Sequence, residues 1–151
     1  MRCKRNIRQL LLFLFGLCTC SVLANAMTFT AIDDPWAGSC GTVLKAIDGS
    51  NIVGFSFGNG TLEHGFLYNG SFTKIVVPLA SIYTDARGIQ GNIIVGDYEG
   101  TGFSHGFLYD GSTYTTIDDP LGAYGTHATG ICGSHIIGSY QDSNLALHGF
   151  L

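Results

Sequence analysis

The sequence has few charged residues, and cations are the scarcest of them. Lys and Arg number seven among 151 residues, and four of these seven fall within the first eight positions. The remaining three are too few for the rows of phosphate contacts that hold nucleic acids, or for a basic patch on anionic lipid. We therefore exclude nucleic acids and membrane surfaces as partners of the folded protein.

Proline and helical patterns are also scarce. There are three prolines against 22 glycines, and beyond the N-terminal segment no apolar stripe with a 3.6-residue period extends over a helical length. With 46% hydrophobic residues, the chain is too apolar to be intrinsically disordered. These features favour a folded all-β domain made of short strands and many turns.

Residues 1–26 have the three-part order of a secretory signal peptide. Four basic residues precede an apolar run at 10–17, and small residues follow up to Ala26. This order predicts cleavage after Ala26 and a secreted or periplasmic protein that meets the membrane only during export. An uncleaved anchor and a lipoprotein site at Cys20 are weaker alternatives. The mature protein would be a single β-repeat domain over 27–151.

A period of about 42 residues divides this domain into three units. Three motifs recur in step. An Ile-Val-Gly or Ile-Ile-Gly motif stands at 52–54, 94–96 and 136–138, and His-Gly-Phe-Leu stands at 64–67, 105–108 and 148–151. All three prolines end a third motif, which begins Phe-Thr or Tyr-Thr, at 29–35, 72–78 and 114–120.

Each unit is predicted to form a meander of four short antiparallel strands. Runs of β-branched and aromatic residues alternate with Gly, Asn and Asp, and in the middle unit they lie at about 84–89, 92–98, 105–109 and 113–118. Asn69-Gly70 and Asp110-Gly111 suit the positive φ angles of a type I′ turn between the third and fourth strands.

These motifs resemble the bacterial extracellular repeats called HAF. The units of that family are similar in their Ile-Val-Gly strand, their His-Ala-Phe-Leu-Tyr strand and their Phe-Thr-x-Ile-Asp-x-Pro strand. Here His-Gly-Phe replaces His-Ala-Phe, and Val76-Val77 replaces the acidic residue in one unit. The resemblance covers 28–151 and implies an exported bacterial protein with β-propeller-like blades. It implies no catalytic activity.

The two ends of the domain look like the two halves of one hairpin. Residues 29–33 match a fourth strand without a third, and 148–151 match a third strand without a fourth. Pairing them, within one chain or between two, would complete the third unit and cover both edges. Propellers usually have four to eight blades, so three units predict a six-bladed homodimer, an unusually small ring or part of a longer array. A three-fold β-trefoil or β-prism is the alternative.

Only two cysteines, Cys40 and Cys132, remain after cleavage. Closure of the domain would make the first and third units neighbours, so we predict a disulfide between these two residues. Two cysteines give no metal-ligand spacing, and we expect no cofactor.

The longer connections of an antiparallel meander gather at the end opposite the tight turns. Aromatic rings beside carboxylates would suit a carbohydrate or a peptide there. The candidate binding residues in or beside these connections are Trp36, Tyr83, Asp85, Asp97, Tyr98, Glu99, Tyr124 and His127.

Two other patterns invite a chemical interpretation. His64, His105 and His148 could be read as zinc ligands, but the third strand of a blade lies away from the axis, so we predict structural histidines and no metal. Asp33-Asp34 and Asp118-Asp119 point to opposite faces of an extended strand, and we predict Asp-Pro turns rather than acid/base pairs.

The function predicted from these observations is that of an exported, non-enzymatic β-repeat module with a binding or structural role and an unknown ligand. Catalytic residues are not identifiable. The alternative is an exported propeller-type hydrolase or lyase acting on carbohydrate. Carboxylates with shifted pKa values in a deep pocket would favour the enzyme, whereas a shallow aromatic face would favour the module.

Overall fold

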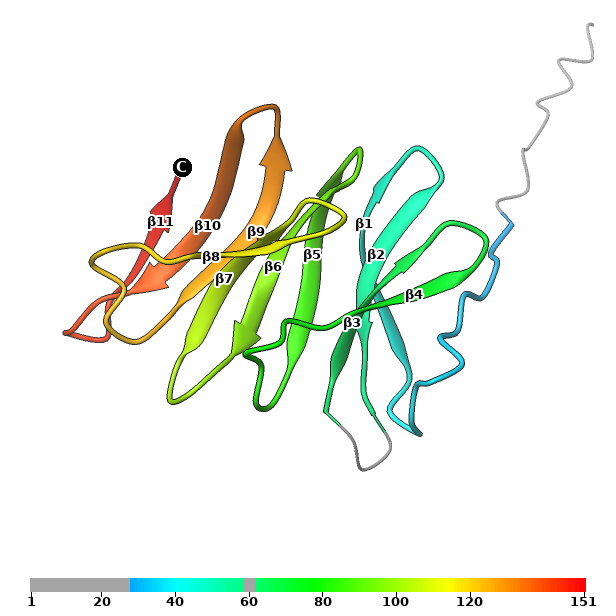
Figure 1. Ribbon diagram of the computed structural model, residues 1–151, viewed down its shortest axis with the longest axis horizontal. Coiled ribbons are helices and arrows are strands. Elements are labelled where there is room, and N and C mark those ends of the chain that lie inside the picture. Colours follow the sequence, from blue (N-terminus) through cyan, green and yellow to red (C-terminus); the bar gives the residue numbers. More distant parts are fainter. Residues whose placement is uncertain (1–27, 59–61) are drawn as a thin grey trace, which may run out of the picture. The chain divides into compact units, whose positions relative to one another are not determined.

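The computed structural model describes residues 28–58 and 62–151, and every regular element in them is a β-strand (Figure 1). The chain divides into two units, 1–30 and 31–151, and all of these strands belong to the second. The expected signal peptide and the cleavage site after Ala26 lie outside the described residues. Within those residues, no helix has the length and apolarity needed to cross a membrane.

The strands form three antiparallel sheets, one for each repeat. Sheet 1 contains, in spatial order, β1 (Thr42–Asp48), β2 (Asn51–Ser56), β3 (His64–Tyr68) and β4 (Phe72–Ile75). Sheet 2 contains β5 (Thr84–Gln90), β6 (Ile93–Glu99), β7 (Ser104–Tyr109) and β8 (Tyr114–Ile117). Sheet 3 contains β9 (Thr126–Cys132), β10 (His135–Gln141) and β11 (Leu147–Phe150). The predicted all-β meander is confirmed, and the described strands form no closed barrel, which a β-trefoil would require.

Glycine sets the tight turn between the first and second strands of each sheet. Gly49, Gly91 and Gly133 have φ angles of 59°, 57° and 60°, and each is the first of the two residues in its turn. A positive φ at the first position alone belongs to a type II′ turn, which matches the twist of the paired strands.

The predicted type I′ turns between the third and fourth strands are wrong. The loops contain residues 69–71 and 110–113, which is more than the two residues of that turn. Of each Asn-Gly or Asp-Gly pair only the glycine has a positive φ. The Asp110 carboxylate instead accepts hydrogen bonds of 2.8 Å from the N–H groups of Ser112 and Thr113, and this holds the wider loop.

A β-bulge recurs between the first two strands of each sheet. It lies at 44–46, 86–88 and 128–130. Beside it stand the glycines of the Ile-Val-Gly motif, Gly54, Gly96 and Gly138, which face the ring of the phenylalanine from the His-Gly-Phe motif. These two sequence motifs therefore mark one local packing arrangement that occurs three times.

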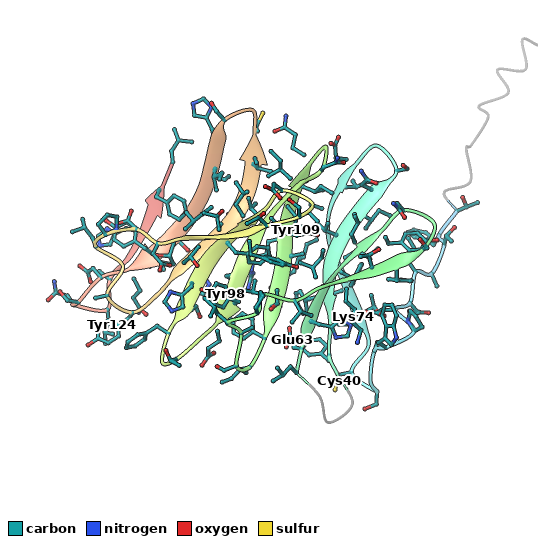
Figure 2. All side chains as sticks on the ribbon, in the orientation of Figure 1. Cys40, Glu63, Lys74, Tyr98, Tyr109 and Tyr124 are labelled. Atoms are coloured by element: carbon teal, nitrogen blue, oxygen red, sulfur yellow. The ribbon has the colours of Figure 1, made fainter. Side chains whose placement is uncertain are left out.

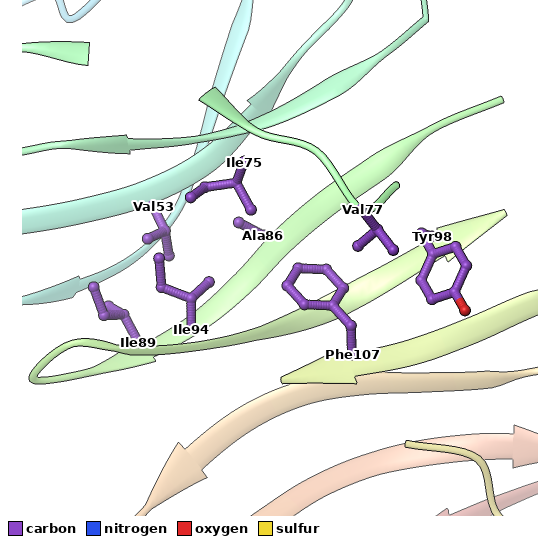
Figure 3. Packing of buried hydrophobic residues seen from close by; sticks show 8 residues of the cluster. All are labelled: Val53, Ile75, Val77, Ala86, Ile89, Ile94, Tyr98 and Phe107. Carbon is purple, nitrogen blue, oxygen red and sulfur yellow. The ribbon is translucent and has the colours of Figure 1, made fainter. Parts of the chain in front are cut away.

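Consecutive sheets pack face to face. Figure 3 shows the main apolar cluster, in which Val53 and Ile75 of sheet 1 meet Ala86, Ile89 and Ile94 of sheet 2. Val77, Tyr98 and Phe107 complete this cluster. The first strand of each following sheet, β5 or β9, lies against the sheet before it.

Glycine and a repeated side-chain bond permit this close packing. A Cβ at Gly65 would lie 3.3 Å from the Ala86 methyl group, and one at Gly106 would lie 3.6 Å from the Ala128 nitrogen. At the turns, Asp48 accepts a 2.6 Å hydrogen bond from Gly91 N–H. Gln90 accepts the equivalent 2.6 Å bond from Gly133 N–H. Both sheet junctions therefore use the same contacts.

The predicted pairing of 29–33 with 148–151 is not present within the chain. Residues 28–34 belong to no strand, and β11 is paired with β10 alone. Asp34 is buried and bonded to Thr42, Ser56 and His64 at the start of sheet 1, and sheet 2 packs between that sheet and sheet 3, which contains β11. The third unit consequently has three strands.

The predicted disulfide is also absent, since Cys40 and Cys132 are both free and exposed. Cys40 lies two residues before the first residue of β1, whereas Cys132 is the last residue of β9. These are opposite ends of equivalent strands, and sheet 2 packs between sheets 1 and 3.

Candidate functional site

The strongest concentration of polar side chains lies where β5, β6 and β9 meet. We call it the polar cluster. It contains Tyr83, Asp85, Arg87, Asp97, Ser104 and His127.

Two carboxylates of the polar cluster share one guanidinium. Asp85 and Asp97 lie directly opposite each other on β5 and β6, and Arg87 is the extra residue of the β5 bulge, which turns it back toward both. The Arg87 Nη2 atom donates to Asp85 Oδ2 at 2.9 Å and to Asp97 Oδ2 at 3.2 Å, and Nε donates to Asp97 Oδ1. Burial opposes the charge on Arg87, but its bonds to Asp97 and the charges of both carboxylates raise its pKa above the ordinary value.

Asp97 is the centre of the cluster and is fully buried. Besides Arg87, its Oδ2 atom accepts from the Tyr83 hydroxyl at 3.1 Å and from His127 Nδ1 at 2.8 Å. The Ser104 hydroxyl lies 2.7 Å from that of Tyr83 and donates to it, because Tyr83 donates to Asp97. Burial and the charge of Asp97 together raise the pKa of Tyr83 to about 12 despite the Ser104 bond, so this phenol stays protonated.

Asp85 is the carboxyl group of the cluster that is left with an incomplete set of partners. It is buried, and its Oδ1 atom accepts no hydrogen bond in the described part of the chain. Burial raises the pKa of Asp85 to about 7. The positive charge of Arg87 lowers this pKa, and the nearby carboxylates of Asp97 and Glu63 offset part of that lowering. One guanidinium cannot neutralise two carboxylates, so Asp85 carries a proton over part of the neutral range.

The geometry of the polar cluster favours a structural role. Its hydroxyl groups and carboxylates are bonded mainly to one another, and Ser104 lies beside Tyr83 rather than beside a base that would activate it. His127 from β9 joins sheet 3 to Asp97 of sheet 2. The cluster therefore ties consecutive units together.

Four of the eight predicted binding residues, Tyr83, Asp85, Asp97 and His127, lie in this cluster. Two others, Tyr98 and Glu99, lie outside the cluster, and Glu99 is half-buried. Tyr98 is buried, stacks on His105 with ring centroids 5.3 Å apart, and has its hydroxyl 3.1 Å from that of Thr116. The carbonyl of Glu99 accepts a 2.7 Å bond from Ser81 N–H, which fixes the connection before β5.

The remaining two, Trp36 and Tyr124, are exposed in the connections before β1 and β9. The Lys74 ammonium lies over the Trp36 ring, 4.8 Å from its centroid, and His64 approaches the ring edge. Tyr124 meets Phe103 edge to face, with centroids 5.4 Å apart. In Figure 2, Tyr124, Glu63 and Cys40 lie toward the same end of the sheets.

That end carries many exposed large apolar side chains, and we call it the loop face. They stand in the connections between the second and third strands and in those that enter each unit. The set is Trp36, Leu62, Leu79, Ile82, Phe103, Leu121, Tyr124 and Leu145.

The repeated histidines each contact a carboxylate and lie in separate sheets. His64 Nε2 bonds to Asp34 at 2.9 Å, His105 Nδ1 to Asp118 at 2.8 Å, and His148 Nε2 contacts Asp142 at 3.4 Å. Within the described residues no three His, Cys, Asp or Glu side chains are grouped to hold a metal ion.

The predicted Asp-Pro turns are present. The Asp34 carboxylate accepts a 2.9 Å hydrogen bond from Trp36 N–H, and the Asp119 carboxylate accepts one of the same length from Leu121 N–H. Both bonds close the turn around the intervening proline.

Sequence reasoning missed Arg87, Ser104 and Phe103. Comparison of the three units could have found Arg87, because this position is not the same residue in each unit: Lys45 and Thr129 stand at the equivalent positions. It also missed Thr42, Thr84 and Thr126, spaced 42 residues apart, whose hydroxyls accept from Asp34, Val77 and Asp119 N–H at 2.9, 3.2 and 3.0 Å.

In comparison with known proteins, no family model matches the chain, and no curated sequence or solved structure is significantly similar to it.

Proposed function

We propose that this chain is an exported, non-enzymatic β-repeat module of the HAF type that binds another protein through its loop face. The observation that carries the proposal is the set of exposed apolar side chains on that face. Single exposed apolar residues are ordinary, but their concentration at one end of a domain is typical of an interaction surface.

The recurrence of these residues supports a shared role. The residue after each proline is large and apolar in all three units, as Trp36, Leu79 and Leu121, and it is exposed each time. None of these side chains belongs to the apolar cluster between sheets 1 and 2. Burial in that cluster therefore does not explain a large side chain at this position.

The composition of the loop face favours a protein partner over a carbohydrate. Most of its side chains are leucine or isoleucine, which offer no flat ring for a sugar to stack on. Of its aromatic side chains, Trp36 already has the Lys74 ammonium over its ring.

The polar cluster gives little support to the alternative of a hydrolase or lyase. An acid/base pair would need two carboxyl groups that face a substrate. Here Asp97 is fully buried and bonded to three side chains, and Asp85 is paired with Arg87.

Export and a blade-like arrangement are part of the same proposal. The charged, apolar and small-residue order of 1–26 supports export. Consecutive four-stranded meanders that pack face to face support blades over a β-prism.

A binding experiment with paired variants tests the proposed function. The purified protein is immobilised and exposed to proteins from the compartment into which the source cell exports it. We expect a protein that binds the wild type and is lost from a Leu79→Ser, Leu121→Ser variant. An Ile47→Ser variant, altered on a sheet face, is the matched control and should retain it.

Two results would contradict the proposal. Equal binding of every retained protein to the wild type and to the loop-face variant would remove the role of this face. Release by a soluble oligosaccharide, together with loss of binding in Trp36→Ala alone, would identify carbohydrate as the ligand.

A further inference from the structure

The outer sheets of the described domain each leave one apolar face bare. On sheet 1, Leu44 and Ile47 are 45% and 68% exposed. On sheet 3, Ile137 and Leu151 are 52% and 82% exposed. We call these the leading face, which also includes Ile52, and the trailing face.

Equivalent residues are buried at the junctions inside the domain. The counterparts of Leu44, Ile47 and Ile52 in sheet 2 are Ala86, Ile89 and Ile94, which pack against sheet 1. The counterparts of Ile137 are Val53 and Val95, and both are fully buried. The leading and trailing faces are therefore the two complementary halves of a junction that the fold forms twice.

The trailing face has the space that the junction requires. A Cβ built at Gly149 would meet no atom closer than 3.8 Å, whereas at the equivalent Gly65 and Gly106 the next sheet lies in contact. A depression of about 420 Å³ beside it is lined by Gly130, Ile131, Cys132, His135, Ile137 and Leu151. Leu44 stands where Ala86 and Ala128 stand on the inner sheets and is larger, so the contact is wider at Gly149 than the inner junctions are at Gly65 and Gly106.

Charge does not oppose such a contact. At the junction of sheets 2 and 3, His127 meets Asp97. The equivalent residues on the leading and trailing faces are Val43 and Ser139, so this charged pair is not repeated at the contact. Lys45 lies beside Leu44 and Ile47, and its ammonium is placed over the Phe55 ring of its own sheet. Gly49 N–H occupies the position of Gly91 and Gly133, whose N–H groups bond to Asp48 and Gln90 of the preceding sheet. Cys132 stands at that acceptor position on the trailing face, so the contact is made by the apolar side chains and not by this bond.

We propose that the trailing face of one copy of this protein packs against the leading face of a second copy. The contact is head to tail, because the two faces differ and each is complementary to the other rather than to itself. It is independent of the loop face and of the function proposed above.

Complementing variants test this inference. Sedimentation of the purified protein over a range of concentrations should show a species of at least twice the mass of one chain. Ile47→Glu and Ile137→Glu should each weaken this association roughly a hundredfold, because each places an unpaired charge in the contact. A mixture of the two variants should again form pairs, since each variant retains the face that the other has lost.

Controls keep the outcome interpretable. Leu79→Glu introduces the same charge at an equally exposed loop residue and should leave the association unchanged. Circular dichroism confirms that each variant is folded, and Leu151→Glu is a second trailing-face variant. A wild type that keeps the mass of one chain at every concentration overturns the proposal. Association that persists in either single variant overturns it as well, because a symmetric contact needs only one face.

Discussion

At the scale of single residues, the glycines beside the bulge have the most restricted environment. A Cβ at Gly96 would overlap the carbonyl oxygen of Asp85 and would lie 2.8 Å from the Phe107 ring. Gly54 and Gly138 meet the same two kinds of neighbour. Since one contact is backbone, relief requires movement of the strand itself.

Gly96→Ala should therefore destabilise the protein by about 2–4 kcal/mol, in the range of an overpacked buried site. Gly149→Ala is the matched control, because the nearest atom to its new methyl group would be 3.8 Å away. Urea unfolding of the two variants measures the difference. Equal stability of both variants would show that the bulge adapts without cost.

Asp85 should make the stability of the protein depend on pH. Its pKa is about 7 in the folded chain against an ordinary value of 3.8, so folding favours its protonated form. This contribution is fully present below about pH 4 and is lost as the pH rises through about 7. At about 1.4 kcal/mol for each pKa unit, the loss amounts to a few kcal/mol.

The Asp85→Asn variant should lack this loss, because the amide is neutral throughout the window. Unfolding free energies measured between pH 4 and pH 8 provide the comparison. Asp110→Asn is the control, and its stability should fall with pH as that of the wild type does. Hydrogen bonds from Thr113 and Ser112 lower the pKa of Asp110, so this group does not titrate between pH 4 and pH 8. A wild type with constant stability across this window would mean that Asp85 stays ionised.

At this scale the sequence indicated several residues of the polar cluster, but not which of them bond to one another. Tyr83, Asp85, Asp97 and His127 stand in or beside the predicted loops, whereas the residue that links the two carboxylates is Arg87, a bulge residue within a strand. A bulge changes which side chains share a face, and the period-2 pattern of a strand does not reveal it.

At the scale of the elements, equivalent positions differ in size according to what covers them. Ala86 and Ala128 are fully buried where one sheet meets the next, whereas the equivalent Leu44 is exposed. A larger side chain is therefore accommodated on the outer sheet and excluded at the inner junctions.

Exchange of these two residue types tests that account. Ala86→Leu should destabilise the protein by about 1–3 kcal/mol, because Gly65 leaves room for a methyl group only. Leu44→Ala should change the stability of the monomer by less than about 0.5 kcal/mol. Thermal unfolding of dilute protein compares them. Tolerance of leucine at position 86 would indicate that the sheets slide apart easily.

The strands were predictable because the same pattern of residues occurs three times in the sequence. The strands of sheet 2 agree with the predicted ranges to within about one residue. The pairing of 29–33 with 148–151 was not predictable, because it assumed that a matching motif adopts a matching conformation. Asp34 is bonded to Ser56 and His64 of sheet 1, and sheet 2 packs between that sheet and β11, so the matching motifs do not pair within one chain.

At the scale of the whole molecule, the proposed export predicts where the mature chain begins. Ala24 and Ala26 match the small residues that signal peptidase recognises, so the exported protein should begin at Met27. Intact mass spectrometry of the exported protein measures this directly. A mass that includes 1–26, or a lipid on Cys20, would favour an anchored protein.

Stability should also vary along the array of sheets. In repeat proteins each unit is stabilised by its own contacts and by those with its neighbours. Sheet 2 has a neighbour on both faces, and Ile94 and Val95 of its β6 strand are buried, whereas β11 is paired on one edge and largely exposed. Amide hydrogen exchange should therefore be slowest in β6 and fastest in β11. Fast exchange at Phe150 would match the free edge of β11. Protection there equal to that of the corresponding Phe107 would require a fourth strand on β11, and the segment 29–33 of a second chain has the matching sequence.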